Sequence, residues 1–332
     1  MRAVFCIALF AALVAGQTAQ NLEQLFRSAV KAQRHGDYNT AIRNYRLLLK
    51  SHPDSVGVLA NLGAALVHEK HFDQGVAEYR EAMKFAPGNS AIEMNLALAL
   101  YKKGDFGEAA KEFAMLAQAK PGNARLETLL GLSLIGGGKR REGATLLDRV
   151  AQRHNDAGAY LTAGSTWLNL DEFKKARRDL EAALRLDPNL PRIHTLVGLA
   201  RDDLGDMAGA EPEFRKALAE NPNDFRANLT LGAELYKQRH LPEARKYLEH
   251  ATALQPSSAM ARYELALVKR ADGDLAAAAT DLQEAIREKP GWLDPHVALA
   301  ALYYKLHRPA DGLKQRQIVQ KLTAEQQERG PK

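Results

Sequence analysis

Histidine spacing comes nearest to a catalytic or metal-binding pattern. His68 and His71 are the closest pair among the ten histidines and could share one face of a helix. A zinc protease places two histidines four residues apart on a helix, whereas these stand three apart. No further ligand has a suitable spacing. We therefore interpret both as solvated side chains and predict no metal site.

Gly131 to Arg140 invites comparison with a phosphate-binding loop. That motif would need glycine at Ser133 and serine or threonine at Arg140, so the pattern fails twice. Acidic pairs such as Asp202-Asp203 fall at expected helix ends, where carboxylates are usually solvated. The sequence has no strained serine elbow and no dinucleotide fingerprint. These observations predict a chain that is not an enzyme and needs no cofactor.

Composition narrows the class of partner. The 46 Lys and Arg residues exceed the 40 Asp and Glu residues, for a net charge of +6, but the charges are interspersed and form no basic block. Nucleic acid is therefore not an expected partner. The single cysteine, Cys6, stands in the first apolar run, which rules out a disulfide framework or a cysteine metal site.

The first residues have the pattern of a secretory leader. Met1 and Arg2 precede an apolar run over 3–15, and small and polar residues follow. We assign 1–19 to a signal peptide and leader and expect an exported protein, periplasmic or secreted. The alternative is a membrane tether formed by an uncleaved N-terminal segment. No later segment approaches the roughly 20 apolar residues of a membrane-spanning helix.

Prolines reveal an internal period. Pro53, Pro87 and Pro121 stand 34 residues apart, and four later prolines from Pro188 to Pro290 keep the same spacing. Such a period indicates a repeat architecture. Nine repeats then fall into register, the fourth one residue short, starting at Leu22, Val56, Ser90, Ala124, Ala157, Pro191, Phe225, Ala259 and Leu293.

Two columns of small residues run through all the repeats. Positions 8 and 20 hold only alanine or glycine, as at Gly198 and Ala210, while positions 7 and 24 are mostly apolar. These stripes predict two helices per repeat. Gly36 and Gly104 fall between the helices, where glycine can end a helix with positive φ. We expect the small residues to mark a close helix crossing that Gly198→Leu would overpack.

These columns resemble those of the tetratricopeptide repeat family, of the exported bacterial type. The resemblance covers 22–322 and implies an all-α, right-handed superhelical solenoid of about nine helix-turn-helix repeats, with a groove lined by the first helices. Residues 323–332 form a polar C-terminal tail that we expect to be frayed. Repeat four has Gly136-Gly137-Gly138 at its turn and is predicted to be the softest joint. Pro212 is expected to delay or bend its helix.

The resemblance also implies which side chains face the groove. Positions 2, 5, 9, 12 and 13 of each first helix face the concave side, and asparagines at position 6 resemble those that hold a peptide backbone in related proteins. The candidate partner-binding residues are Asn61, Met94, Asn95, Tyr101, Lys102, Arg125, Arg192, Arg226, Tyr236, Lys237, Tyr263, Tyr304 and Lys305. This aromatic and basic lining favours a somewhat acidic protein or peptide. Alternatively, the recurring Tyr-Lys pairs reflect only the family's average sequence.

We therefore expect a scaffold or adaptor of the cell envelope that binds a partner protein or peptide. The alternative is a substrate-recognition subunit of an envelope glycosyltransferase or protease whose catalytic chain is separate. We also expect the double change Tyr236→Ala, Lys237→Glu to weaken partner recovery without shifting the melting temperature, because both side chains should face solvent.

Overall fold

The computed structural model describes residues 20–328, and every regular element in that range is an α-helix. The predicted leader and Cys6 lie outside the described residues. The chain divides into two compact units, an N-terminal unit (Met1–Leu170) and a C-terminal unit (Asp171–Lys332). The division falls between the two helices of repeat five.

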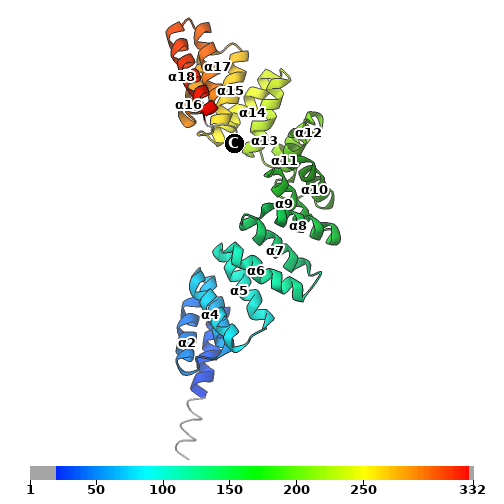
Figure 1. Ribbon diagram of the computed structural model, residues 1–332, viewed down its shortest axis with the longest axis vertical. Helices are drawn as coiled ribbons and strands as arrows, with labels where there is room; N and C mark the ends of the chain where they lie inside the picture. Colours follow the sequence, from blue (N-terminus) through cyan, green and yellow to red (C-terminus); the bar gives the residue numbers. More distant parts are fainter. Residues whose placement is uncertain (1–19, 329–332) are drawn as a thin grey trace, which may run out of the picture. The chain divides into compact units, whose positions relative to one another are not determined.

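Each repeat contributes two consecutive helices (Figure 1). Residues 20–34 are helical and form the first helix of repeat one. The following helices of the N-terminal unit are α2 (Tyr38–Ser51), α3 (Val56–His68), α4 (Phe72–Phe85), α5 (Ser90–Lys103), α6 (Phe106–Ala119), α7 (Ala124–Gly136), α8 (Arg140–His154) and α9 (Ala157–Leu168).

The C-terminal unit continues the same alternation. Its helices are α10 (Phe173–Leu186), α11 (Ile193–Asp202), α12 (Met207–Glu220), α13 (Phe225–Lys237), α14 (Leu241–Leu254), α15 (Ala259–Ala271), α16 (Leu275–Glu288), α17 (Leu293–Lys305) and α18 (Pro309–Glu328). The expectation of a frayed tail is wrong for 323–328, because α18 continues through these residues. Residues 329–332 are outside the described range.

The small columns lie where the two helices of a hairpin cross. A Cβ atom at Gly198 of α11 would stand 2.7 Å from Cε1 of Phe214 on α12. In the N-terminal unit, a Cβ at Gly131 of α7 would stand 2.8 Å from Cγ of Leu147 on α8. Side-chain carbon atoms do not approach this closely without a shift, so these contacts confirm the predicted close crossing.

The turn inside each hairpin uses the left-handed backbone region. Position 15 has positive φ in every repeat, and glycine fills it in five of them, as at Gly273 (φ 88°). The others carry Lys70 (φ 63°), Asp171 (φ 57°), Arg239 (φ 67°) and His307 (φ 57°). The predicted role of the turn glycines is thus confirmed, and four repeats adopt the same turn with a side chain that disfavours it.

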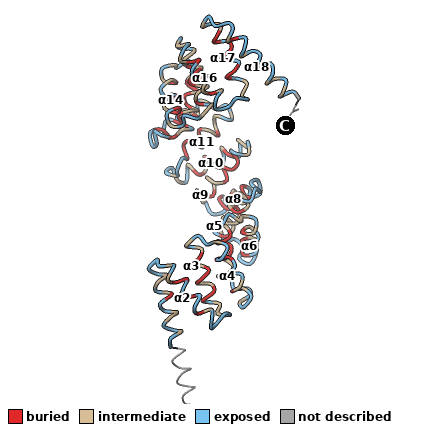
Figure 2. The backbone as a smooth tube through the Cα atoms, turned by 90° about the vertical axis from the view of Figure 1, so that its left-hand side faces the viewer, coloured by how far each residue is buried: buried red, intermediate tan, exposed pale blue. Residues whose placement is uncertain are grey.

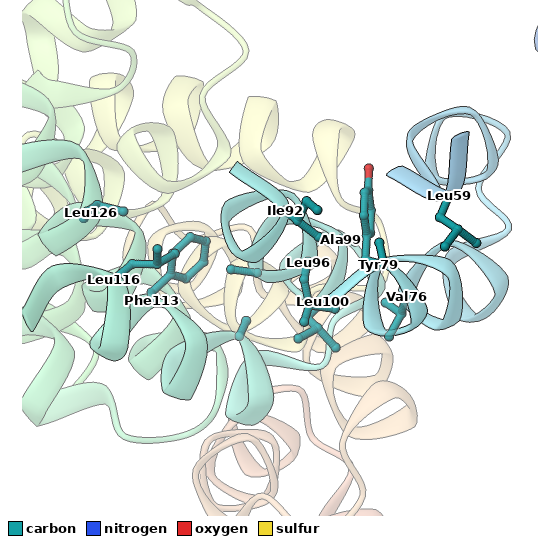
Figure 3. Packing of buried hydrophobic residues seen from close by; sticks show 13 residues of the cluster. Leu59, Val76, Tyr79, Ile92, Leu96, Ala99, Leu100, Phe113, Leu116 and Leu126 are labelled. Carbon is teal, nitrogen blue, oxygen red and sulfur yellow. The ribbon is translucent and has the colours of Figure 1, made fainter. Parts of the chain in front are cut away.

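Apolar side chains from both helices fill the space between neighbouring hairpins. In the N-terminal unit, Tyr79, Leu96 and Phe113 belong to one buried cluster that extends from α3 to α7 (Figure 3). Buried residues follow the helices, whereas the hairpin ends are mostly exposed (Figure 2). The core therefore continues from repeat to repeat within a unit, as stacked hairpins require.

Repeat four departs locally from its neighbours. Only Gly138 among its three turn glycines has positive φ, and a Cβ at Gly136 would meet the Phe106 ring at 2.7 Å. At the end of α8, Asn155 adopts φ 51° and donates its backbone N–H to Ala151 O, which turns the chain without the usual proline. The absence of a side chain at Gly136 thus makes room for an aromatic ring of α6.

Repeat six differs from the sequence predictions at the start of both helices. Pro212 lies inside α12, yet α12 begins at Met207, the same repeat position at which the other second helices begin, so Pro212 does not delay the helix, and a bend at Pro212 stays a prediction. The preceding helix, α11, begins at Ile193, two residues after the predicted repeat start at Pro191. Arg192 caps it with φ 63° and is not part of the helix.

Candidate partner-binding grooves

In the N-terminal unit the candidate residues come from α3, α5 and α7. Those with exposed side chains are Asn95, Lys102 and Arg125, and those partly buried are Asn61, Met94 and Tyr101. Tyr101 packs its ring edge against Phe106, with centroids 5.3 Å apart. Asn61 and Asn95 make no side-chain hydrogen bond within the described chain, so their amides can contact a peptide backbone.

The neighbouring groove positions of this unit are small or apolar. Ala60, Ala64, Val67 and Leu98 occupy positions 5, 9 and 12 of α3 and α5, and all are partly buried against the core. A partner segment here would contact mainly aliphatic surface, with amides of asparagine beside it. Such a surface favours an apolar segment and distinguishes little between charges.

In the C-terminal unit, Arg192 and Arg226 come together near the start of α13. Both line a cleft of about 480 Å³, and Arg192 Nε lies 4.0 Å from Oδ2 of the buried Asp224. The sequence placed Arg192 on a first helix, whereas its left-handed backbone places it before α11. It therefore approaches the groove from the preceding turn.

Further along, a single ammonium group is surrounded by carboxylates. Lys237 Nζ donates to Oε1 of the buried Glu234 at 2.6 Å, and both residues belong to α13. Asp202 on α11 and Glu264 on α15 interact electrostatically with this pair. We call these four residues the groove cluster.

The groove cluster departs from the predicted basic lining at Lys237. Within the described chain, the side-chain carboxyls of Asp202 and Glu264 have no hydrogen bond or ion pair, while the charge of Lys237 is already neutralised by Glu234. The cluster thus presents unpaired negative charge. Tyr236, beside it, is partly buried against the core. The premise of the Tyr236→Ala, Lys237→Glu prediction, that both side chains face solvent, holds for the exposed Lys237 but not for the partly buried Tyr236. We therefore expect the double change to lower the melting temperature.

Burial and repulsion change the proton affinity of the two unpaired carboxyls. Burial, followed by repulsion from Glu234, raises the pKa of Asp202 to about 6, although Lys237 opposes the shift. Burial also raises the pKa of Glu264, against the attraction of Lys237. With its pKa at about 6, Asp202 is mostly ionised at neutral pH, and a cation placed beside Asp202 and Glu264 would lower the pKa values of both again.

Aromatic side chains continue the groove surface on α15 and α17. Tyr263 packs beside Trp292 with ring centroids 4.8 Å apart. Tyr304 covers Gly312 of α18, and the Arg316 guanidinium lies 4.6 Å from its ring centroid. Tyr263 and Tyr304 are partly buried, so their rings also support the fold. Lys305 is exposed.

Sequence reasoning missed the residues that decide the charge of this groove. Asp202 occupies position 12, where several repeats carry tyrosine, and Glu264 occupies position 6, where asparagines were noted in other repeats. The alignment of the repeats by position shows both of these acidic residues. Glu234 stands at position 10, which the family pattern does not assign to the groove, and only the structure shows its bond to Lys237.

Two structural observations bear on other classes of function. Among residues 20–328, no three His, Cys, Asp or Glu side chains are grouped so that they could hold a metal ion. In the same range no helix has the length and apolar character needed to span a membrane.

Sequence comparison supports the family resemblance directly. A tetratricopeptide repeat profile matches residues 26–90, 161–225 and 229–291, which is more than half of the chain. A second profile of the same family matches 66–132. These matches confirm the all-α superhelical repeat fold predicted from the sequence.

Individual relatives are longer proteins that share only part of this chain. Cellulose synthase operon protein C of Xanthomonas axonopodis pv. citri is 32% identical over 149 residues, 42% of this chain and 10% of that protein. The peroxisomal targeting signal receptor of Kluyveromyces lactis is 33% identical over 125 residues, 36% of this chain and 22% of the receptor.

Solved structures of smaller repeat proteins are also similar. MamA of Desulfovibrio magneticus RS-1 is 27% identical, covers 51% of this chain and 96% of its own, and has a TM-score of 0.47. YrrB, described as a TPR protein with an unusual peptide-binding site, is 22% identical, covers 55% and 94%, and has the same TM-score of 0.47.

Proposed function

We propose, from the premise that the chain belongs to the tetratricopeptide repeat family, that it is a non-enzymatic scaffold whose first helices hold a partner protein or peptide. The groove cluster is the observation that carries this proposal. Two carboxylates without protein partners lie in it, beside partly buried tyrosines. A partner that supplies a cation would offset the repulsion that each carboxylate receives from Glu234 and would gain charge-assisted hydrogen bonds.

The partner segment in the C-terminal unit is a peptide with a lysine or arginine side chain. Its ammonium or guanidinium group would lie between Asp202 and Glu264, and its apolar part would lie against Tyr236 and Tyr263. Tyrosine suits this role because it offers a flat apolar face and a polar tip. This proposal replaces the acidic partner expected from sequence, since Lys237 is already paired.

For location we retain the sequence expectation as a proposal. The leader pattern of residues 1–19 supports an exported protein that acts in the cell envelope, either free or tethered by that segment. Cell fractionation with an antibody to the full-length chain tests this point. Recovery with the cytosolic fraction would overturn it.

A second candidate function is an accessory subunit that recognises the substrate of an envelope glycosyltransferase system. The similarity of 42% of this chain to cellulose synthase operon protein C favours this alternative over a protease system. The two candidates differ in the partner: a glycosyltransferase chain co-purifies under the second proposal, and a different protein under the first.

A charge reversal in the groove tests the scaffold proposal. Partner recovery by the tagged full-length chain from the source cells should fall at least tenfold for Glu264→Lys. The matched control Glu288→Lys makes the same charge change at the end of α16, outside the groove, and should recover the partner like wild type. Circular dichroism checks that both variants fold. Equal recovery by all three chains would contradict the proposal.

A further inference from the structure

Outside the grooves, a recurring side-chain contact closes the space between a first helix and its own second helix. In repeats six, eight and nine of the C-terminal unit, position 4 hydrogen bonds to position 23. The three pairs are His194 to Glu213 at 2.6 Å, Arg262 to Asp281 at 3.1 Å and His296 to Gln315 at 2.7 Å.

Repeat seven lacks this contact. Asn228 occupies position 4 and Tyr247 occupies position 23. The Asn228 amide group instead donates to two backbone carbonyls, Pro222 O at 2.8 Å and Asp224 O at 2.9 Å. The short asparagine side chain thus bonds to the preceding turn and leaves the space beside Tyr247 open.

A cleft of about 660 Å³ occupies this place, between α12 and α14. Its volume lies within the range of about 300 to 1,000 Å³ typical of sites for small organic molecules. The apolar part of its wall consists of Leu218, Ala219, Pro222, Tyr247 and Ala253. The Tyr247 ring provides a flat surface against which another aromatic ring can pack.

Two polar groups of the wall lack a protein partner. Asn228 is 2% exposed and lines the cleft, and its Oδ1 accepts no hydrogen bond within the described chain. This oxygen is not one of the fully buried unsatisfied atoms of the described chain, so a hydrogen-bond donor of a ligand or water in the cleft can reach it. Lys246 makes no ion pair in that range, and its Nζ lies 5.8 Å from the centroid of the Tyr247 ring.

The other charged side chains of the wall, and His250, already have partners. Arg215 pairs with Glu243 at 2.7 Å, Glu249 with Arg245 at 2.8 Å, and His250 hydrogen bonds to Asn223 at 3.1 Å. Lys246 is therefore the charge of the wall that remains available to a ligand. It favours an anion over a cation.

We propose that this cleft is a second binding site, for a flat aromatic anion that carries one N–H or O–H donor. The aromatic ring of the ligand packs between Tyr247 and the other apolar residues of the wall. The N–H or O–H group of the ligand donates to Asn228 Oδ1, and its anionic group pairs with Lys246. The site goes beyond the scaffold function, since its wall comes mainly from second helices and contains no residue of the groove cluster.

The probe 8-anilinonaphthalene-1-sulfonate tests this proposal, because it combines aromatic rings, one N–H donor and one sulfonate. Fluorescence titration of the full-length chain should show one saturable site per chain. Ala253→Trp, at an exposed alanine of the wall, should fill the cleft and weaken binding at least tenfold. Lys246→Gln, at an exposed side chain, should weaken binding about threefold or more.

Two control variants separate this site from other surfaces. Ala276→Trp adds the same ring at an exposed alanine of α16 and should bind the probe like wild type. Glu264→Lys should also bind the probe normally, so failure of the groove proposal leaves this one standing. No saturable site in wild type, unchanged binding by both cleft variants, or equal loss in Ala276→Trp would overturn the proposal.

Discussion

The N-terminal and C-terminal units differ most at the repeat positions that face the groove. Position 12 carries Val67 and Ile135 in the N-terminal unit, but Asp202 and Arg270 in the C-terminal unit. At position 6, neutral Asn61 in one unit contrasts with Glu264 in the other. The first groove is therefore largely aliphatic, whereas the second is charged and aromatic.

The hairpin crossings of the two units, by contrast, are built alike. Gly131 and Gly198 each leave room for a large side chain of the opposite helix. Positions 8 and 20 are fixed by this contact, while groove positions have no such steric limit and can vary. One chain can thus combine two different binding surfaces on a common scaffold, and we expect each groove to hold a chemically different segment.

The largest loss of stability should come from a large side chain placed at the helix crossing of a hairpin, and the loss should be similar in both units. Gly198→Leu and Gly131→Leu each overpack a contact shorter than 3 Å and should lower the free energy of unfolding by about 1 to 3 kcal/mol. Chemical denaturation measures this change. Gly57→Leu is the control, because a Cβ there meets no atom within 4 Å. An unchanged unfolding midpoint for either glycine-to-leucine variant would contradict the claim that both units have the same close helix crossing.

The next largest effect, a pH-dependent change in stability, should occur only in the groove of the C-terminal unit. In the folded chain the pKa of Asp202 is raised from 3.8 to about 6, so the fold favours the protonated carboxyl. The stability that the protonated carboxyl contributes is fully present below pH 3.8 and is lost as pH rises through 6. Asp202→Asn should therefore stabilise the fold at pH 7.5 by about 1 kcal/mol after allowance for solvent screening.

Thermal unfolding at two pH values checks this linkage. The gain of Asp202→Asn over wild type should shrink between pH 7.5 and pH 4. Asp54→Asn is the control, since Asp54 is exposed and distant in sequence from the groove cluster. A gain that is equal at both pH values would show that charge burial is not its cause.

A smaller effect should appear at the internal turns. Arg239→Gly should raise stability by about 0.5 to 1 kcal/mol, because arginine at φ 67° is strained and glycine is not. Gly273→Ala, in the same turn position of the next repeat, should lower stability by a similar amount. Urea denaturation of the pair tests this, and a loss of stability in Arg239→Gly would contradict it.

The last prediction compares hydrogen exchange in repeat four with that in repeat three, and it gives a direction without a magnitude. We expect hydrogen exchange of α7 and α8 to be faster than that of α5 and α6, because the repeat has a glycine-rich turn and lacks the terminal proline. The contact of Phe106 with Gly136 opposes this softening. Equal protection of both helix pairs would show that the contact compensates fully.

Much of the fold could be predicted from sequence because periodic constraints are local. The small residues at positions 8 and 20 indicated the crossings, and glycine at position 15 indicated the turns. Two features were less accessible. The polar composition of 323–328 indicated a tail, although these residues consist mainly of the helix formers Ala, Glu and Gln and α18 continues through them. At Arg239 and Lys70 the turn has the left-handed backbone conformation that these side chains usually avoid, so the residue type does not indicate it.

The site was predicted less well, because its charge depends on contacts between helices. Lys237 reads as a free cation in the sequence, but Glu234, one turn earlier on α13, neutralises it. Asp202 and Glu264 lie 62 residues apart in the chain, and each interacts electrostatically with Lys237 of α13. Family position alone marked Tyr236 and Tyr263 as groove residues and did not reveal the carboxylates beside them.

The most direct test of the groove is a titration of the full-length chain with two peptides of equal length, one rich in lysine and one rich in glutamate. Calorimetry should show tighter binding of the lysine peptide, a loss of at least tenfold in Glu264→Lys, and weaker binding at pH 5 than at pH 7, where Asp202 is ionised. Tighter binding of the glutamate peptide by the wild-type chain would contradict the account.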